Sequence, residues 1–304
     1  MALLGLAKDL CRHHQWTLHI WHGNHGWHDA AQRCCDALGL WCREQGLDFQ
    51  STNADPTTVD SEAKARAWRY HCLETTATRL QAVVPTAHTA TDRTETLLLQ
   101  LARGTDLRGL CSLREQRPIR EQAPEGIQLS RPMLMFERQH TNAICRELNL
   151  PLWNDPTNTS PLFARNRIRH EVMPVLEELY PGCQARISNL SERLSKIQDI
   201  QQELIDQQLE AHATSDQTSR ALMMSSSLDV RRLLMQRWMT QQGVPALKSM
   251  ELDRLCRRLG PQQPPGESHL PQGWLIKWTK HNLSLHSPTK TSDKNQKNRG
   301  HADQ

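Results

Sequence analysis

One stretch of the sequence places three chemically capable side chains close together: VVPTAHTATDRTETLLLQLARG, residues 83–104. An apolar run that is typical of a strand ends near Thr86, and His88 follows almost at once. Asp92 and Glu95 then lie at i and i+3 in the first turn of a predicted helix, a spacing that puts both carboxylates on one face. Acidic residues in a first turn also stabilise a helix by offsetting its dipole. The pair is therefore either part of a polar site or a helix cap.

A second stretch, NDPTNTSPLFARNRIRHEVMPVLEELYP (residues 154–181), concentrates positive charge. A polar, turn-rich loop comes first, and Arg165, Arg167 and Arg169 follow before an apolar helix. Three arginines so close repel one another unless a polyanion compensates them. Arg165 and Arg169, four positions apart, share one helix face and could hold phosphate groups bidentately. The alternative is a solvated basic helix face.

A third stretch, IWHGNHGWH (residues 20–28), follows a predicted strand. His22, His25 and His28 with two glycines would make a polar, conformationally permissive turn. A metal site is one interpretation, but no carboxylate or thiol lies nearby to complete it. We therefore favour loop residues placed over a pocket.

Alternating strands and helices should position these side chains. The pattern predicts an opening helix, a strand at 16–21, a helix at 28–45, a strand at 46–50, a helix at 60–80, a strand at 82–86, a helix at 92–103 and a strand at 127–134. This alternation indicates a parallel α/β sheet with right-handed crossovers. Ligands bind beyond the carboxyl ends of the strands in such sheets, where the first and third stretches would lie.

The pattern changes beyond residue 180. Long helices are predicted at 184–210, 228–242 and 248–259, with a terminal hairpin formed by WLIKW and NLSL. The expected organisation is an α/β domain over 1–180, a mainly helical domain over 181–286 and a disordered tail over 287–304, which has no apolar pattern.

Composition narrows the class of protein. Nine cysteines form no C-x-x-C pair, which indicates reduced structural thiols rather than a metal cluster or a disulfide framework. No signal peptide and no membrane-spanning run is apparent, so a cytoplasmic protein is expected. The formal net charge of +4 permits a polyanionic partner without requiring one.

Five segments occur in a fixed order along the chain: NHGW, AKARAWRY, AHTATDRTETLLLQLARGTDLRGL, RPML and WNDPTNTSPLFARNRIRHEVMPVLEE. In order and spacing they resemble the tRNA(Ile)-lysidine synthase family, enzymes of the PP-loop ATP-pyrophosphatase superfamily. The resemblance covers about residues 1–280 and is dense over 1–180. It implies a HUP-like parallel sheet, and a ligase that uses ATP to join L-lysine to C2 of the wobble cytidine in the CAU anticodon of tRNA(Ile).

The resemblance also implies roles for individual residues. Asp92 and Glu95 would hold Mg²⁺ or the incoming lysine, and His88 would lie against the ATP and cytidine side of the pocket. Arg69 would bind phosphate or the tRNA base, and His25 would lie on the nucleotide-facing loop. Arg165 and Arg169 would engage the substrate near the active site. The implied substrates are ATP, L-lysine and tRNA(Ile), without a membrane partner, and a homodimer is compatible with the resemblance.

One family signature, Ser-Gly-Gly-x-Asp-Ser, does not occur in the sequence. In the family this loop cradles pyrophosphate with backbone N–H groups after a first strand, and a helix resembling MALLGLAKDL follows. We therefore expect a PP-loop domain without its first strand. Two hypotheses stay open: an enzyme whose start was assigned at an internal methionine, which we favour, and a non-catalytic tRNA-binding descendant. A tRNA-thiolating relative is disfavoured because paired cysteines are lacking.

Overall fold

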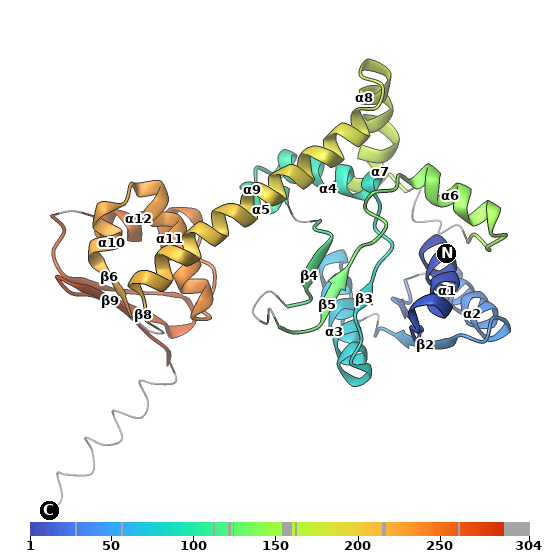
Figure 1. Ribbon diagram of the computed structural model, residues 1–304, viewed down its shortest axis with the longest axis horizontal. Helices are drawn as coiled ribbons and strands as arrows, with labels where there is room; N and C mark the ends of the chain where they lie inside the picture. The colour runs from blue at the N-terminus through green and yellow to red at the C-terminus, as the bar shows by residue number, and fades with distance from the viewer. Residues whose placement is uncertain are drawn as a thin grey trace, which may run out of the picture. The chain divides into compact units, whose positions relative to one another are not determined.

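The computed structural model describes residues 1–27, 29–55, 57–111, 113–120, 123, 125–153, 160–161, 163–214, 217–260 and 262–288. The polar loop at 154–159, His28 and residues 289–304 of the expected tail lie outside this description. The chain divides into two compact units, Met1–Gln198 and Asp199–Gln304 (Figure 1). No described helix combines the length and the apolar character that crossing a bilayer requires.

The strands of the first unit form two ladders. In one, β1 (His19–Asn24) pairs in parallel with β2 (Asp48–Asn53) over six residues. In the other, β3 (Val84–Pro85) pairs in parallel with the central β5 (Gln128–Ser130), and β4 (Gln116–Pro118) is antiparallel to β5. The predicted parallel sheet is thus confirmed. Among the described residues, no hydrogen-bonded ladder joins β1 to β3.

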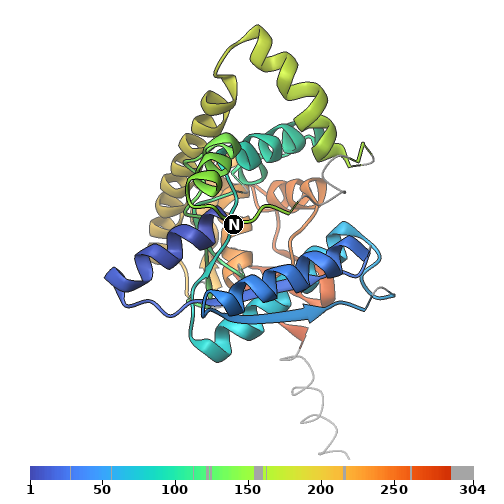
Figure 2. The same cartoon turned by 90° about the vertical axis from the view of Figure 1, so that its right-hand side faces the viewer.

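Helices cover these strands as the alternating pattern predicts. The bounds are α1 Ala2–His14, α2 Asp29–Glu44, α3 Glu62–Leu80, α4 Ala90–Arg103, α5 Leu107–Leu110 and α6 Arg138–Glu147. Helix α2 packs against β1 and β2, and α1 packs against α6 (Figure 2). Ser61, one of two predicted N-cap residues, caps α3 by accepting a hydrogen bond from the Lys64 amide. Apolar side chains of α3 pack against β3 and β5 around Leu129, which is fully buried.

The arginine-rich stretch forms one broken helix that leads out of the α/β core. Helix α7 (Ala164–Arg167) continues into a π-helical turn, η2 (Ile168–Val172), and then into α8 (Met173–Leu179). Both α7 and η2 pack against α4, so the arginines are brought to the helix that carries Asp92 and Glu95. Helix α9 (Cys183–His212) follows.

The second unit combines helices with an antiparallel sheet. Its elements after α9 are β6 Gln217–Ser219, α10 Arg220–Ser225, α11 Leu228–Gln241, α12 Ser249–Arg258, β7 Gly266–His269, η3 Pro271–Gly273, β8 Leu275–Trp278 and β9 Asn282–His286. The sheet order is β6-β9-β8-β7. The predicted helices and the β8–β9 hairpin are confirmed, and two further strands extend the hairpin. Trp238, 1% exposed, lies in the core between helices and sheet.

Arg231 is buried in this second core and ties three loops together. Its guanidinium donates to the carbonyl oxygens of Met223 (2.6 Å), Cys256 (2.8 Å) and Ser226 (3.0 Å). The neighbouring Arg232 instead lies at the surface, where it pairs with Asp253 at 2.8 Å. Two adjacent arginines therefore have opposite structural weight.

We predict that Arg231→Met lowers the free energy of unfolding of the second unit by about 3 kcal/mol, because three buried carbonyl oxygens lose their donors. The matched variant Arg232→Met should change it by less than about 1 kcal/mol. Urea denaturation followed by tryptophan fluorescence measures both. Equal effects of the two substitutions would contradict the structural role of Arg231.

Candidate active site

The N-terminus of α4 places the first group of predicted site residues. Thr89 is its N-cap, and a capping box joins Thr89 to Asp92. Asp92 Oδ2 accepts hydrogen bonds from the Thr89 amide (2.8 Å) and the Thr89 hydroxyl (2.7 Å). Asp92 is therefore a helix cap, one of the two interpretations of the sequence. Its second oxygen is left to face other partners.

Glu95 lies one turn further along α4 and is fully buried between two arginines. Arg165 Nε donates to Glu95 Oε2 at 2.7 Å, and Arg169 donates through Nε to Oε1 (2.6 Å) and through Nη2 to Oε2 (2.9 Å). A buried carboxylate keeps its charge only when such partners replace the water it has lost. Glu95 is thus the centre of the cluster.

The same arginines reach Asp92 and link both carboxylates into one network. Asp92 Oδ1 accepts from Arg165 Nη2 at 3.0 Å, and Arg138 Nη2, from the start of α6, lies 3.5 Å from the same oxygen. Burial would raise the pKa of Asp92, but Arg165, the hydrogen bonds from Thr89, and Arg138 outweigh it, so the pKa is lowered. Asp92 is ionised at neutral pH.

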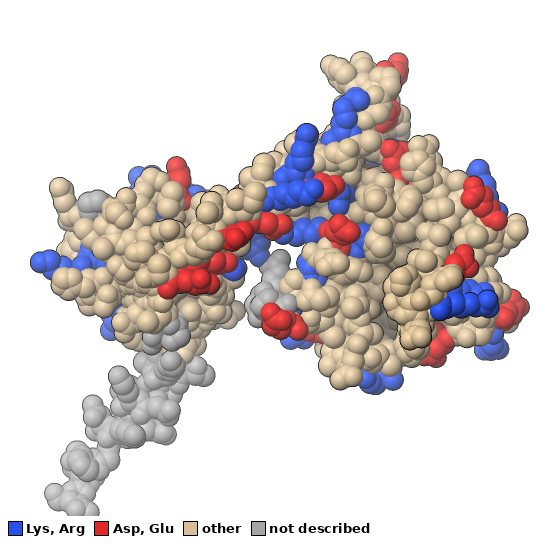
Figure 3. Space-filling model, in the orientation of Figure 1, with Lys and Arg blue, Asp and Glu red and all other residues tan. Residues whose placement is uncertain are grey.

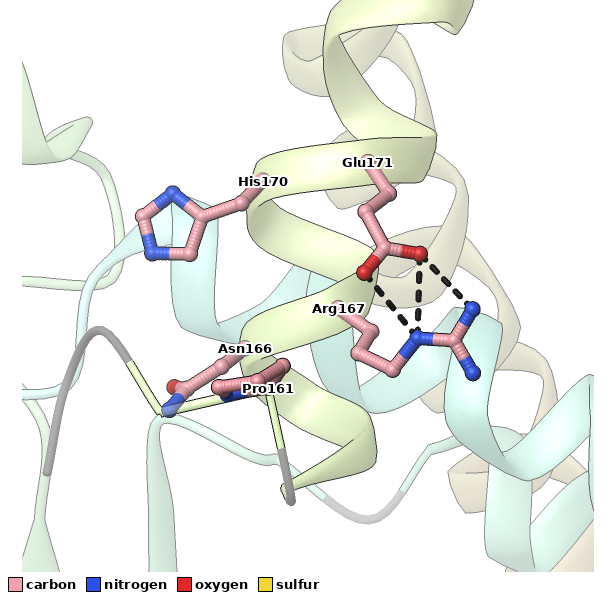
Figure 4. Close-up of a pocket in the computed structure, with 5 residues that line it drawn as sticks. All are labelled: Pro161, Asn166, Arg167, His170 and Glu171. Atoms are coloured by element: carbon pink, nitrogen blue, oxygen red, sulfur yellow. Dashed lines mark hydrogen bonds and ion pairs between the residues drawn. The ribbon is translucent and has the colours of Figure 1, made fainter.

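The three arginines of the RNRIRH segment divide between two faces. Arg165 and Arg169 point toward α4, so the prediction that they share a face is confirmed, and the partners they contact are carboxylates. Arg167 points outward and pairs with Glu171 at 2.8 Å. Figure 4 shows this pair in a pocket lined by Pro161, Asn166, Arg167, His170 and Glu171.

His88 lies between β3 and α4 in a half-buried position. Its Nδ1 is 2.9 Å from the Thr86 hydroxyl, which also lies 3.4 Å from the Ser130 carbonyl oxygen. The hydroxyl can only donate to that carbonyl, so Nδ1 carries the ring proton and Nε2 keeps its lone pair. Burial, reinforced by Arg131, lowers the pKa of His88 from 6.5 to about 4. The imidazole is neutral at physiological pH.

A second group of predicted residues gathers at the carboxyl end of β1. Arg69 Nη2 lies 2.6 Å from His25 Nε2. The His25 ring is 5.2 Å from that of Trp27 and 5.1 Å from that of Trp68, centroid to centroid. Burial first, and then Arg69, lowers the pKa of His25. Among the described residues, no hydrogen bond or ion pair links this group to the Asp92–Glu95 network.

Two arginines in this region were not singled out by the sequence interpretation. Arg138 contacts Asp92, and Arg131 lies behind His88. The signal for Arg131 was its place directly after a predicted strand, within RPML. No comparable local signal marks Arg138, because it reaches Asp92 only through the tertiary packing of α6 near α4, where the Arg138 amide donates to Thr91 Oγ1 at 3.2 Å.

Comparisons with known proteins fit this geometry. A family model described as a PP-loop domain matches residues 1–176. The tRNA(Ile)-lysidine synthase of Parasynechococcus marenigrum is 49% identical over 288 residues, 95% of this chain and 86% of the relative. That of Prochlorococcus marinus strain SARG is 41% identical over 293 residues, 94% of this chain and 86% of the relative. The chain belongs to the tRNA(Ile)-lysidine synthase family.

A solved structure shares the fold of this lysidine synthase family member at lower similarity. The U34-tRNA thiolase NcsA of Methanococcus maripaludis matches with a TM-score of 0.52 and 17% identity, over 64% of this chain and 68% of the thiolase. The expected PP-loop architecture is confirmed by the family model and by this neighbour. The roles of individual residues stay predictions.

We predict that Glu95→Gln lowers the free energy of unfolding by about 3 kcal/mol or more, because the charge between two buried arginines is removed. Urea denaturation measures the loss. The control is Glu171→Gln, which breaks an exposed i,i+4 pair with Arg167 and should have little effect. If Glu95→Gln were as mild as its control, the network would not be a structural centre.

We predict that the His88 imidazole titrates with a midpoint of about 4. Its unfolded value is near 6.5, so the unfolded chain binds the proton more readily. The stability due to neutral His88 is complete above pH 6.5 and is lost as the pH falls toward 4. Imidazole NMR resonances of the native chain, assigned with His88→Gln, measure the midpoint. A midpoint near 6.5 would contradict the burial of the ring.

Proposed function

We propose that the chain carries out the reaction of its family, the ATP-dependent ligation of L-lysine to C2 of the wobble cytidine of tRNA(Ile) with a CAU anticodon. The product reads AUA in place of AUG. The observation that carries the proposal is the Asp92–Glu95–Arg165–Arg169 network beyond the carboxyl end of β3, in a chain 49% identical to a lysidine synthase over 95% of its length. This edge of an open α/β sheet is where ligands bind.

The reaction consists of two balanced transfers. The C2 oxygen of cytidine attacks the α-phosphorus of ATP, and pyrophosphate leaves. The lysine ε-amine then attacks C2, the C2–O bond breaks, AMP leaves and the nitrogen loses a proton. Activation is needed because a ring carbonyl oxygen is a poor leaving group and AMP is a good one.

Within this reaction, the geometry favours distinct roles for the site residues. His88, neutral and with Nε2 free to accept, would take the proton that the attacking amine releases. Asp92 Oδ1 would attract the cationic amine of lysine before it loses that proton. Arg165 and Arg169 would neutralise phosphate charge. Glu95 is a positioning residue in this scheme, because both of its oxygens already accept from arginines and none of its surface is exposed.

The arrangement does not fit a Mg²⁺ ion bound by Asp92 and Glu95 alone. Mg²⁺ needs an octahedral shell of oxygens, usually one or two carboxylates plus phosphates and water. Here both oxygens of Glu95 and the free oxygen of Asp92 face guanidinium groups. No group of three metal-ligating side chains occurs among the described residues. The predicted metal role of this pair is therefore not used in the scheme.

His25 and Arg69 would contact substrate at the end of β1. The aromatic rings of Trp27 and Trp68 beside His25 are surfaces on which a nucleobase can stack. The Arg69 guanidinium supplies a positive charge at the same place. This arrangement supports the predicted nucleotide-facing role of the pair.

Exposed arginines and lysines outside the site would contact the tRNA backbone. Helix α9 carries exposed Arg186, Arg193 and Lys196, and Figure 3 shows basic side chains gathered over this helix in the first unit. Such contacts give salt-dependent, sequence-independent affinity. A cytoplasmic location and a homodimer stay predictions.

The second candidate function is tRNA binding without catalysis. It is favoured by one observation, the absence of Ser-Gly-Gly-x-Asp-Ser from the sequence. The two candidates differ in a single measurement, the incorporation of labelled lysine into tRNA.

The test incubates the purified protein with ATP, radiolabelled lysine and a tRNA(Ile) transcript that carries a CAU anticodon. We expect ATP-dependent incorporation, and none into a transcript with uridine at the wobble position. Binding of the CAU transcript without incorporation would reject the ligase and support the binding-only alternative.

We predict that Asp92→Asn lowers the incorporation rate by about 10²-fold, as for other positioned electrostatic groups. Asparagine keeps an oxygen that can cap α4, so the loss would report the missing charge. The matched control is Asp106→Asn: Asp106 caps α5 through the Gly109 amide and contacts none of the site residues. A near-normal rate for Asp92→Asn would reduce this residue to a helix cap.

A further inference from the structure

Three guanidinium groups from three different elements surround Tyr70 in the first unit. The Cζ atoms of Arg66, on α3, and Arg117, on β4, lie 5.0 and 5.1 Å from the centroid of the Tyr70 ring. Arg131, directly after β5, also acts electrostatically on Tyr70. We call Arg66, Tyr70, Arg117 and Arg131 the Tyr70 cluster.

Arg131 has the least satisfied side chain of the cluster. It is fully buried, and its Nη1 donates to the Arg114 carbonyl oxygen at 2.6 Å. Its Nε and Nη2 are buried without a hydrogen-bond partner. Leaving two donors of a buried cation unpaired is costly unless a further group completes them. The side chain is therefore prepared for an acceptor that the protein itself does not supply.

The cluster also lacks negative charge. Among the described residues, none of its three arginines forms an ion pair with a carboxylate. The contrast with nearby arginines is clear, since Arg120, which follows β4, pairs with Glu74 at 2.7 Å and Arg165 and Arg169 pair with Glu95. Three like charges so close repel one another unless an anion joins them.

The position of the cluster connects it with the candidate active site. Arg131 follows Ser130, whose strand partner is Pro85 in β3, and the chain continues from β3 to His88. Both Arg131 and Arg66 influence His88 electrostatically. Figure 1 shows α3 beside the β3–β5–β4 sheet. The cluster thus lies at the sheet edge where substrates are expected.

We propose that Arg66, Arg117, Arg131 and the Tyr70 hydroxyl bind a phosphate group of a substrate. Guanidinium groups match phosphate oxygens in geometry and charge, and a phosphate would supply the acceptors that Arg131 lacks. The phosphate belongs either to the RNA backbone or to a nucleotide. Its assignment to a substrate rests on the proposed function, whereas the binding of a phosphate by the cluster does not.

Tyr70 offers a direct readout of binding. Burial would raise its pKa, but Arg66, Arg117 and Arg131 outweigh burial, so the pKa is lowered. A bound phosphate would offset these charges and raise the pKa again. The chain has two tyrosines, so the variant Tyr180→Phe leaves Tyr70 as the single tyrosine signal.

The experiment labels the Tyr180→Phe chain with ¹³C at tyrosine Cζ and records the Tyr70 resonance at a pH near its midpoint. Pyrophosphate, ATP and an RNA oligonucleotide with the anticodon-loop sequence are added separately. We expect at least one probe to move Tyr70 toward its protonated form. A response to RNA alone assigns the RNA backbone, and a response to ATP and pyrophosphate assigns the nucleotide.

Variants connect the response with the cluster. Arg131→Met should weaken the responding probe by about 10-fold or more, since each charge-assisted contact is worth about 1.5–3 kcal/mol. Because that variant can also disturb folding, the exposed Arg66→Gln provides a second test. Arg120→Gln, whose guanidinium is already paired with Glu74, is the control and should leave binding unchanged.

The proposal is overturned if no probe moves the Tyr70 resonance, or if the response survives both Arg131→Met and Arg66→Gln. Its failure is distinguishable from failure of the proposed reaction. A chain that incorporates lysine with an unresponsive Tyr70 would reject the site and keep the function, and a responsive Tyr70 without lysine incorporation would do the reverse.

Discussion

The ionised carboxylate of Glu95 is the constraint on which the arrangement of the site depends. It lies at the centre of packed protein with no exposed surface, and charged groups are placed there only when their partners are secured. Its partners come from residues 70 and 74 positions further along the chain. The α7–η2 segment is therefore held against α4 by charge as well as by packing. Asp92 benefits secondarily, since the arginines that satisfy Glu95 also reach its free oxygen.

Two kinds of order meet at this site. The capping box at Thr89 is local and depends on residues within one turn of α4. The arginine contacts are long-range and form only when the first unit is assembled. The local part fixes where the carboxylates point, and the long-range part fixes their ionisation state. The neutral imidazole of His88 between these charges follows from the same separation, because burial and a nearby cation both act against its protonation.

Much of the architecture could be predicted from sequence, because its determinants are local. Periodicity and end signals located α3 and α4, with Ser61 and Gly104 at their ends. Strand alternation indicated the parallel sheet. The i,i+4 spacing of Arg165 and Arg169 predicted a shared face, but spacing cannot tell what that face meets. The carboxylate partners, and the contact of Arg138 with Asp92, arise from segments distant in sequence. The unpaired donors of Arg131 were hidden for the same reason.

The π-helical turn η2 has a consequence for the tolerance of this segment to insertion and deletion. Its closing hydrogen bond runs from the Met173 amide to the Ile168 carbonyl, so the turn holds one residue more than an α-helical turn. Removing one residue after Arg169 would restore α geometry and rotate the following helix by about 100° relative to the arginines. The wide turn thus acts as a phase adjuster: Arg165 and Arg169 keep step with α4, while α8 keeps step with the chain that leads into α9.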